Sequence, residues 1–186
     1  MSEQKNNESD KLEENKKDSG DSNKNGLLYE EITDLKDRYN IVDTKDGYKI
    51  IEFNDSEKKI IQVNKFKLHK YMEKHNKKNM NIKVAHGCKC PDEAYVIEDE
   101  KKLFIIEKKF QHCSGSTCEK IQTGDFKKKH YRKLFPSYKV EYIFCLSDWF
   151  KLNCESEIEY LEEIKIPIFW GNDANYKDKI ILFMIS

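Results

Sequence analysis

Two groups of charged residues stand at the ends of one apolar stretch. Pro91-Asp92 precedes it, and Glu107-Lys108-Lys109 follows after fourteen intervening residues. If the segment between them is a β-hairpin, its ends meet at one end of a sheet, and two carboxylates lie beside an ammonium group. Carboxylate oxygens are ligands that Mg2+ prefers, and an ammonium group stabilises charge developing on an attacked phosphate. These residue types therefore indicate metal-dependent hydrolysis of a phosphodiester.

The place of Glu107 in its strand separates this triplet from similar ones in the chain. Residues 57–59 and 100–102 have the same Glu-Lys-Lys sequence, but turns are expected there. Glu107 directly follows the apolar residues 103–106, and strand alternation predicts that it shares a face with Lys109 while Lys108 lies on the other face. A carboxylate at that depth is normally retained only with a partner or a metal, because an unpaired buried charge costs several kcal/mol. A salt-bridged surface strand is the simpler alternative.

These residues resemble the PD-(D/E)XK nuclease superfamily and, within it, the type II restriction endonucleases. The resemblance covers roughly residues 87–149: Pro91-Asp92, the fourteen-residue interval, Glu107-Lys108-Lys109, Gln111, and a Gly-Ser loop leading to a helix with Glu119-Lys120. It implies an α/β fold with a restriction-endonuclease-like core, in which helices flank a mixed central β-sheet on both faces. It also implies Mg2+-dependent hydrolysis of double-stranded DNA that leaves 5′-phosphate and 3′-hydroxyl ends.

The resemblance implies a role for each matching residue. Asp92 and Glu107 would ligate Mg2+, together with the backbone carbonyl of Lys108. Lys109 would orient or activate the attacking water and offset charge on the phosphate. Gln111 would help to position the water or the backbone.

Further candidates lie outside the motif. Some members of the superfamily use a glutamate from an earlier helix, for which Glu31 and Glu73 are candidates, whereas Glu119 fits better as a charge at a helix N-terminus. DNA contact is expected from a basic stretch after the motif. Its candidate phosphate-binding residues are Lys127, Lys128, Lys129, Arg132 and Lys133. A solvated helix face is the alternative explanation of this charge run.

Composition favours one folded domain. The chain has 186 residues, of which 37% are charged and 38% hydrophobic, enough for one core. Residues 1–26 hold no aromatic side chain and only Met1 and Leu12 as apolar ones, so they are predicted to form a disordered polar tail. Residues 27–186 are predicted to be a single nuclease domain. The chain has no membrane-length apolar stretch and no signal-peptide core, which predicts a cytoplasmic protein without membrane contact.

The six cysteines are expected to be reduced in that compartment. Cys88, Cys90, Cys113 and Cys118 flank the hairpin, but their spacing departs from the pairs typical of structural zinc sites. Thiols without a metal are therefore favoured over a zinc site. Cys145 lies in an apolar run and is expected in the core.

Hydrophobic periodicity and turn signals predict alternating strands and helices. Helices are expected at 27–39, 65–76, 117–135 and 149–164, with Gly124-Asp125 as a point of interruption in the third. Strands are expected at 48–53, 59–63, 93–97, 102–110, 139–146, 167–170 and 180–185. From the central hairpin onward this order predicts a mixed sheet with helices on both faces.

Four functional hypotheses follow. The first is a type II restriction endonuclease acting as a homodimer, because cutting both strands symmetrically calls for two copies of one site; a cognate DNA methyltransferase encoded alongside would be its partner. The second is a structure-specific or repair nuclease with the same core, such as a Holliday junction resolvase. The third is a non-catalytic DNA- or protein-binding module that has kept the fold. The fourth is an unrelated α/β domain with a chance triplet, favoured if the Asp92 and Glu107 oxygens are too far apart to share a cation.

Overall fold

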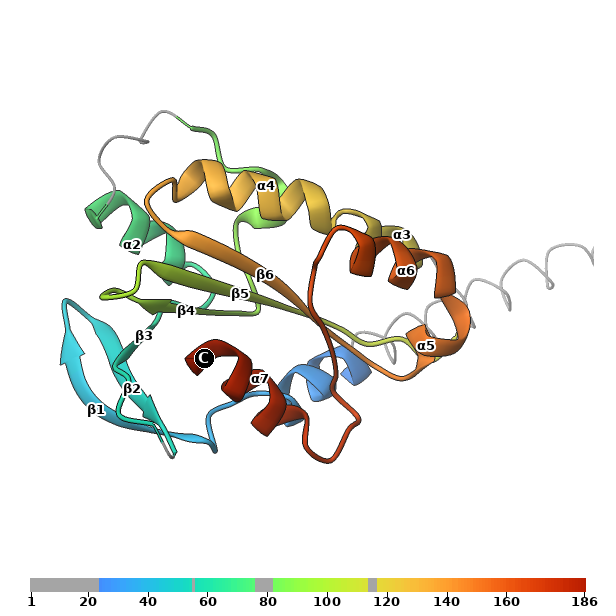
Figure 1. Ribbon diagram of the computed structural model, residues 1–186, viewed down its shortest axis with the longest axis horizontal. Helices are drawn as coiled ribbons and strands as arrows, with labels where there is room; N and C mark the ends of the chain where they lie inside the picture. Colours follow the sequence, from blue (N-terminus) through green and yellow to red (C-terminus); the bar gives the residue numbers. More distant parts are fainter. Residues whose placement is uncertain (1–23, 55, 76–81, 114–116) are drawn as a thin grey trace, which may run out of the picture.

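A seven-stranded mixed sheet organises the chain (Figure 1). The computed structural model describes residues 24–54, 56–75, 82–113 and 117–186. The strands are β1 (Tyr39–Lys45), β2 (Tyr48–Phe53), β3 (Ile60–Gln62), β4 (Glu93–Ile97), β5 (Lys102–Lys109), β6 (Lys139–Leu146) and β7 (Ile168–Trp170), and their order in the sheet follows the chain. Strands β1 to β5 pair antiparallel, whereas β5–β6 and β6–β7 pair parallel. The predicted α/β class with a mixed sheet is confirmed.

Helices cover both faces of this sheet (Figure 1). A helix at residues 24–32 and α7 (Tyr176–Ile185) pack on one face. On the other face pack α2 (Lys67–His75), η2 (His86–Cys88), α3 (Thr117–Gln122), α4 (Gly124–Leu134), α5 (Trp149–Asn153) and α6 (Glu155–Glu163). Parallel neighbours need a crossover, which α3–α4 supply between β5 and β6 and α5–α6 supply between β6 and β7. None of the helices in the described ranges is long and apolar enough to cross a membrane.

The central strands are buried on both faces because their side chains alternate between two cores. In β5, Leu103 and Ile105 join the core under α2 and α4, whereas Phe104 and Ile106 join the core against residues 24–32 and α7. Burial continues through the charged end of the strand, to Lys108. The predicted alternation is confirmed, and it carries charged side chains into the edge of both cores.

Most predicted elements match the structure, with two breaks. Strands at 48–53, 93–97 and 139–146 coincide with β2, β4 and β6 at both ends. The helix predicted at 117–135 is divided into α3 and α4 next to Gly124, where interruption was expected. The helix predicted at 149–164 is divided at Cys154 into α5 and α6.

Two local predictions are wrong, and one strand of the sheet was not predicted. Residues 24–26, assigned to the tail, begin a helix that ends at 32 instead of 39; residues 1–23 lie outside the described part of the chain. Strand β1 was not predicted, because it is an edge strand exposed along nearly its whole length and lacks core-facing alternation. Residues 180–185 form the second half of α7 rather than a strand. The buried residues Tyr176, Ile180, Ile181 and Met184 occupy one helical face, a spacing hidden within a continuous apolar run.

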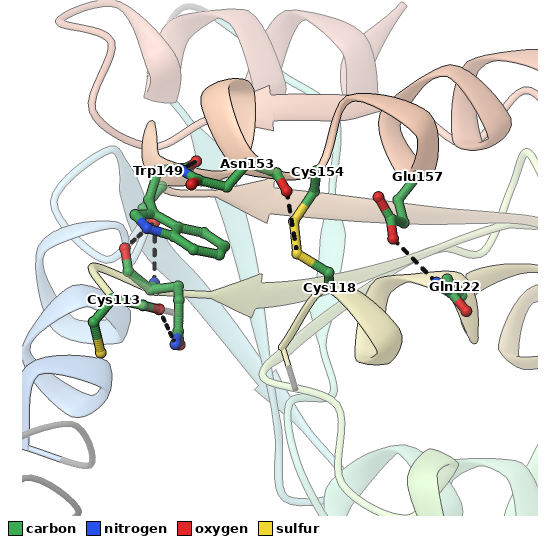
Figure 2. The surroundings of a disulfide bond; sticks show 9 residues. Cys113, Cys118, Gln122, Trp149, Asn153, Cys154 and Glu157 are labelled. Carbon is green, nitrogen blue, oxygen red and sulfur yellow. Dashed lines mark hydrogen bonds between the residues drawn. A yellow bond between two sulfur atoms is a disulfide. The ribbon is translucent and has the colours of Figure 1, made fainter. Parts of the chain in front are cut away.

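The expectation of six reduced cysteines is also wrong. Cys118 and Cys154 form a disulfide that ties α3 to the junction of α5 and α6 (Figure 2). Their Cα atoms are 5.9 Å apart, within the range that a disulfide spans. Because Cys118 is bonded in this way, the four thiols considered for zinc are not available together. Cys145 is a buried free thiol, as predicted.

Candidate active site

Asp92 and Glu107 face each other across the β4–β5 hairpin. Glu93 pairs with Ile106, so the next position toward the open end sets Asp92 opposite Glu107. Opposite side chains on one face of an antiparallel pair have Cβ atoms about 5 Å apart. The main-chain N–H of Lys108 donates a hydrogen bond of 2.7 Å to Asp92 Oδ2, which fixes this carboxylate at the end of the sheet. The hairpin thus brings the two carboxylates together.

The ammonium group of Lys109 lies among the oxygens that the motif assigns to a cation. Its Nζ is 2.8 Å from Glu107 Oε1 and 3.9 Å from Asp92 Oδ2. It also donates a hydrogen bond of 3.0 Å to the main-chain oxygen of Lys108. One positive group in reach of all three oxygens shows that this donor set accommodates a cation.

A divalent metal at this position would be held mainly by oxygen and water. Among the described residues, no group of three or more His, Cys, Asp and Glu side chains is placed to hold a metal ion. The donor set is instead two carboxylates and one main-chain carbonyl. Such a set suits Mg2+, which commonly binds one or two carboxylates and keeps several waters. The residues therefore fit Mg2+ better than a metal that demands an all-protein cage.

Glu107 has a second cationic partner, Lys127, which the sequence analysis assigned to DNA phosphates. Lys127 Nζ is 2.9 Å from Glu107 Oε1, and only 13% of the Lys127 side chain is exposed. Gly87 leaves room for it, since a Cβ at that position would lie 3.3 Å from Lys127 Cε. No local spacing reveals this contact, because only the crossover of α4 over β5 brings residues 107 and 127 together.

The charges of this cluster shift the pKa values of Asp92, Glu107 and Lys109. Burial raises the pKa of Asp92 to about 6, with Lys109 opposing and Glu107 reinforcing this shift. Burial also disfavours the charged form of Glu107, but Lys109 and Lys127 outweigh it and hold the pKa of Glu107 below its ordinary value. For Lys109, the neighbouring carboxylates outweigh burial and raise its pKa. Two carboxylates and two ammonium groups thus balance to a neutral cluster above about pH 6.

A second charged cluster lies on the opposite face of the same strand ends. Glu93 and Lys108 form a buried ion pair, and the Tyr95 hydroxyl donates a hydrogen bond of 2.5 Å to Glu93 Oε2. Lys108 Nζ also donates to the main-chain oxygen of Glu30 at 3.0 Å. A cation at the C-terminal turn of a helix satisfies free carbonyls and complements the helix dipole. This pair therefore fastens the helix at 24–32 to the sheet.

The helix at 24–32 brings two glutamates to the edge of the site: Glu31, a candidate from sequence, and Glu30, which was not one. Both glutamates line one cavity of about 250 Å3, together with Asp92, Glu93 and Lys108. The Glu30 charge also acts on the pKa values of Asp92 and Lys109. By contrast, Glu31 is exposed and lies 3.9 Å from Lys36. The other candidate, Glu73, is exposed on α2.

The remaining predicted site residues are not gathered at the carboxylates. The Gln111 amide donates a hydrogen bond of 2.6 Å to the carbonyl of Cys113, and its role among the catalytic groups stays a prediction. Lys128 needs correction as a DNA contact, because it is buried and donates to the carbonyl of Lys165 at 2.7 Å. Lys129 pairs with Asp125, and Arg132 and Lys133 are exposed on α4. Glu119 is in the first turn of α3, the place expected for it.

Comparisons with known proteins identify no family for this chain. A scan against protein-family models and searches of curated proteins and of solved structures found no match to the chain. Functional inference therefore rests on the arrangement of Asp92, Glu107 and Lys109 at the end of the hairpin.

Proposed function

We propose that the protein is a Mg2+-dependent endonuclease that hydrolyses phosphodiester bonds of double-stranded DNA. One observation carries this proposal. The Lys109 ammonium group contacts or approaches Asp92 Oδ2, Glu107 Oε1 and the Lys108 carbonyl, the three oxygens that the motif assigns to Mg2+. The fourth hypothesis, a chance triplet, requires the Asp92 and Glu107 oxygens to be too far apart to share a cation; against it, both lie within 3.9 Å of the same Lys109 Nζ.

The side chains divide the work of an in-line displacement. Bound Mg2+ would polarise a phosphate oxygen and lower the pKa of a water ligand. Asp92 and Glu107 hold the cation position, and Lys109 orients the attacking water and offsets charge on the phosphate. Lys127, released from Glu107, supplies a second positive group beside the same phosphate. The products would carry 5′-phosphate and 3′-hydroxyl ends.

The proposal includes a restriction-endonuclease-like core and, in its first form, a type II enzyme working as a homodimer. The antiparallel β4–β5 hairpin, the parallel β5–β6 pair and the intervening helices agree with that core. Symmetric cutting of a duplex calls for two copies of the site. A structure-specific nuclease with the same catalytic groups is the second form, favoured by a stacked aromatic pair on α4, Phe126 and His130, of which Phe126 is exposed.

The test is incubation of the purified chain with plasmid and long linear duplex, with Mg2+ or with EDTA. We expect Mg2+-dependent cleavage that is lost in Asp92→Asn, Glu107→Gln and Lys109→Met. Discrete fragments would identify site-specific cutting and report the target sequence and overhang together. Cleavage restricted to branched DNA would identify the structure-specific form.

The chain offers a matched control in residues 100–102, which repeat the Glu-Lys-Lys sequence where the β4–β5 turn enters β5. There Glu100 pairs with Lys58 and Lys102. Glu100→Gln and Lys102→Met should leave cleavage unchanged. Full activity in all three active-site variants would refute the proposal, as would a lack of hydrolysis of every DNA by the parent protein.

A further inference from the structure

The outer face of α4 carries an aromatic pair that the proposed hydrolysis does not use. Phe126 is 59% exposed. Its ring stacks on that of His130, with centroids 5.8 Å apart and planes 15° from parallel. The His130 ring is itself held in place, because its Nε2 accepts a hydrogen bond of 3.0 Å from the Ala85 N–H. The pair is therefore a preformed stacking surface rather than one loose apolar side chain.

One loop connects this pair to the active site. Residues 83–89 contact α4 at several points: Gly87 lies against Lys127, the Ala85 N–H donates to His130, and the Cys88 carbonyl accepts a hydrogen bond from Tyr131. Lys127 in turn contacts Glu107. On a helix with 3.6 residues per turn, Phe126 and His130 occupy the strip of α4 next to Lys127. A strand with its scissile phosphate at Glu107 therefore has a short path across the loop to Phe126.

The side chains around this path carry positive charge. Residues 83–89 and 125–133 contain seven basic residues and a single acidic one, Asp125. The basic residues are Lys83, Lys89, Lys127, Lys128, Lys129, Arg132 and Lys133. Lys128 is turned inward and Lys129 pairs with Asp125, but Lys83, Lys89 and Arg132 remain exposed. A polyanion with flat apolar groups matches this combination, whereas an apolar peptide or acyl chain would match the ring alone.

We propose that the outer face of α4 and residues 83–89 bind a nucleic-acid strand, with an unpaired base stacked on the Phe126–His130 pair. The inference rests on the proposed nuclease function and narrows its substrate class to DNA with unpaired nucleotides near the scissile phosphate. Bases in an intact duplex already stack on one another and present no free face to Phe126. Single-stranded, forked or branched DNA does present one. The surface thus favours the structure-specific form of the nuclease.

The test is DNA binding measured by fluorescence anisotropy in EDTA, so that no hydrolysis is required. Three labelled DNAs of equal length are compared: a single strand, a fork and a fully paired duplex. Phe126→Ala should weaken binding of the single strand and the fork by about 5- to 150-fold, the loss expected for one base–aromatic stack. Duplex binding should change by less than about twofold on the same reasoning, and Phe126→Trp should keep the affinity of the parent protein.

Leu152, an 87% exposed apolar side chain of α5, provides the matched control, and Leu152→Ala should leave all three affinities unchanged. Equal affinity of Phe126→Ala and the parent protein for the single strand would overturn the inference, and so would equal losses on all three DNAs. Cleavage assays separate this result from the proposed function. If DNA binding depends on Phe126 but no DNA is hydrolysed in Mg2+, the proposed nuclease function is refuted. If hydrolysis depends on Asp92 but Phe126→Ala binds DNA as the parent protein does, only the proposed stacking surface is refuted.

Discussion

Replacing Asp92 by asparagine should abolish cleavage and yet make the metal-free protein more stable. The carboxylate is held at the end of β4 by the Lys108 N–H and is only 20% exposed at the side chain. Burial raises its pKa from the ordinary value of 3.8 to about 6. Burial opposes the charged form of Asp92, so keeping this carboxylate charged lowers the stability of the folded protein. A bound cation would recover that stability.

The sign and size of the effect follow from this pKa difference. The folded protein binds the Asp92 proton more tightly than the unfolded chain, so the stability from this group is fully present below pH 3.8 and is lost as the pH rises through about 6. A difference of about two pH units corresponds to about 3 kcal/mol. Asparagine stays neutral, so Asp92→Asn should gain about 2–3 kcal/mol at about pH 8 and about half of that near pH 5. The gain at about pH 8 corresponds to an unfolding midpoint raised by about 5–10 °C.

The assay is urea unfolding in EDTA across this pH range, with the free energy of unfolding compared between the two proteins. Asp99→Asn, an exposed aspartate in the β4–β5 turn, is the matched control and should change little. Adding Mg2+ should stabilise the parent protein but not Asp92→Asn. An Asp92→Asn protein that is less stable than its parent at pH 8, or whose gain does not depend on pH, would refute this reasoning.

Three further predictions concern the same region. Lys127→Met removes one of the two ammonium groups on Glu107 Oε1 and should tighten Mg2+ binding about tenfold in calorimetric titrations, since a charge-assisted hydrogen bond contributes about 1.5–3 kcal/mol. Lys129→Met, the control, should leave Mg2+ affinity unchanged. Equal Mg2+ affinities of Lys127→Met and the parent protein would contradict competition between Lys127 and Mg2+ for Glu107. Lys108→Met leaves Glu93 buried without its cation and should lower the free energy of unfolding in urea by about 3–5 kcal/mol. The double variant with Glu93→Gln should recover most of this loss. Additive losses from the two substitutions would contradict the buried ion pair. Reduction with dithiothreitol should lower the free energy of unfolding by about 3–4 kcal/mol, because the Cys118–Cys154 disulfide spans 36 residues. Cys118→Ser should be insensitive to the reductant, whereas Cys113→Ser should respond as the parent protein does. An unchanged unfolding midpoint of the parent protein on reduction would argue against the disulfide.

Local sequence patterns predict the central elements of the fold and fail at its margins. Strands β4 and β6 are short apolar runs bounded by turns or charges, so their limits coincide with the prediction. Strand β1 escapes because its residues face solvent on both sides, and hydrophobic alternation reports only strands that pack on a core. The end of α7 is misread because a run that is apolar at nearly every position fits both strand and helix periods, and only the packing of Tyr176 four residues before Ile180 decides between them.

Prediction of the site follows the same division between local and tertiary information. Asp92, Glu107 and Lys109 come together through one hairpin, whose register the sequence contains. Lys127 and Glu30 reach the same place from separate helices, and no spacing along the chain encodes those contacts. Glu31, the candidate from sequence, lines the same cavity but is exposed and lies beside Lys36. Glu30 is one residue earlier, a rotation of about 100° on a helix, and its charge acts on the pKa values of Asp92 and Lys109.

Side-chain alternation at the ends of β4 and β5 places one cluster of carboxylates and lysines on each face of the sheet, and the two clusters differ in their exposure to solvent. Glu93 and Lys108 are almost fully enclosed, with side chains 3% and 2% exposed, and their partners are Tyr95 and a helix carbonyl. This ion pair is almost closed to solvent, and it holds the helix at 24–32 through the contact of Lys108 with the Glu30 carbonyl. On the other face Asp92 and Lys109 keep 20% and 23% of their side chains exposed, so water and a cation reach oxygens that only lysines now occupy. Access to solvent, rather than residue type, is therefore what separates the cluster proposed for hydrolysis from the one that anchors the helix.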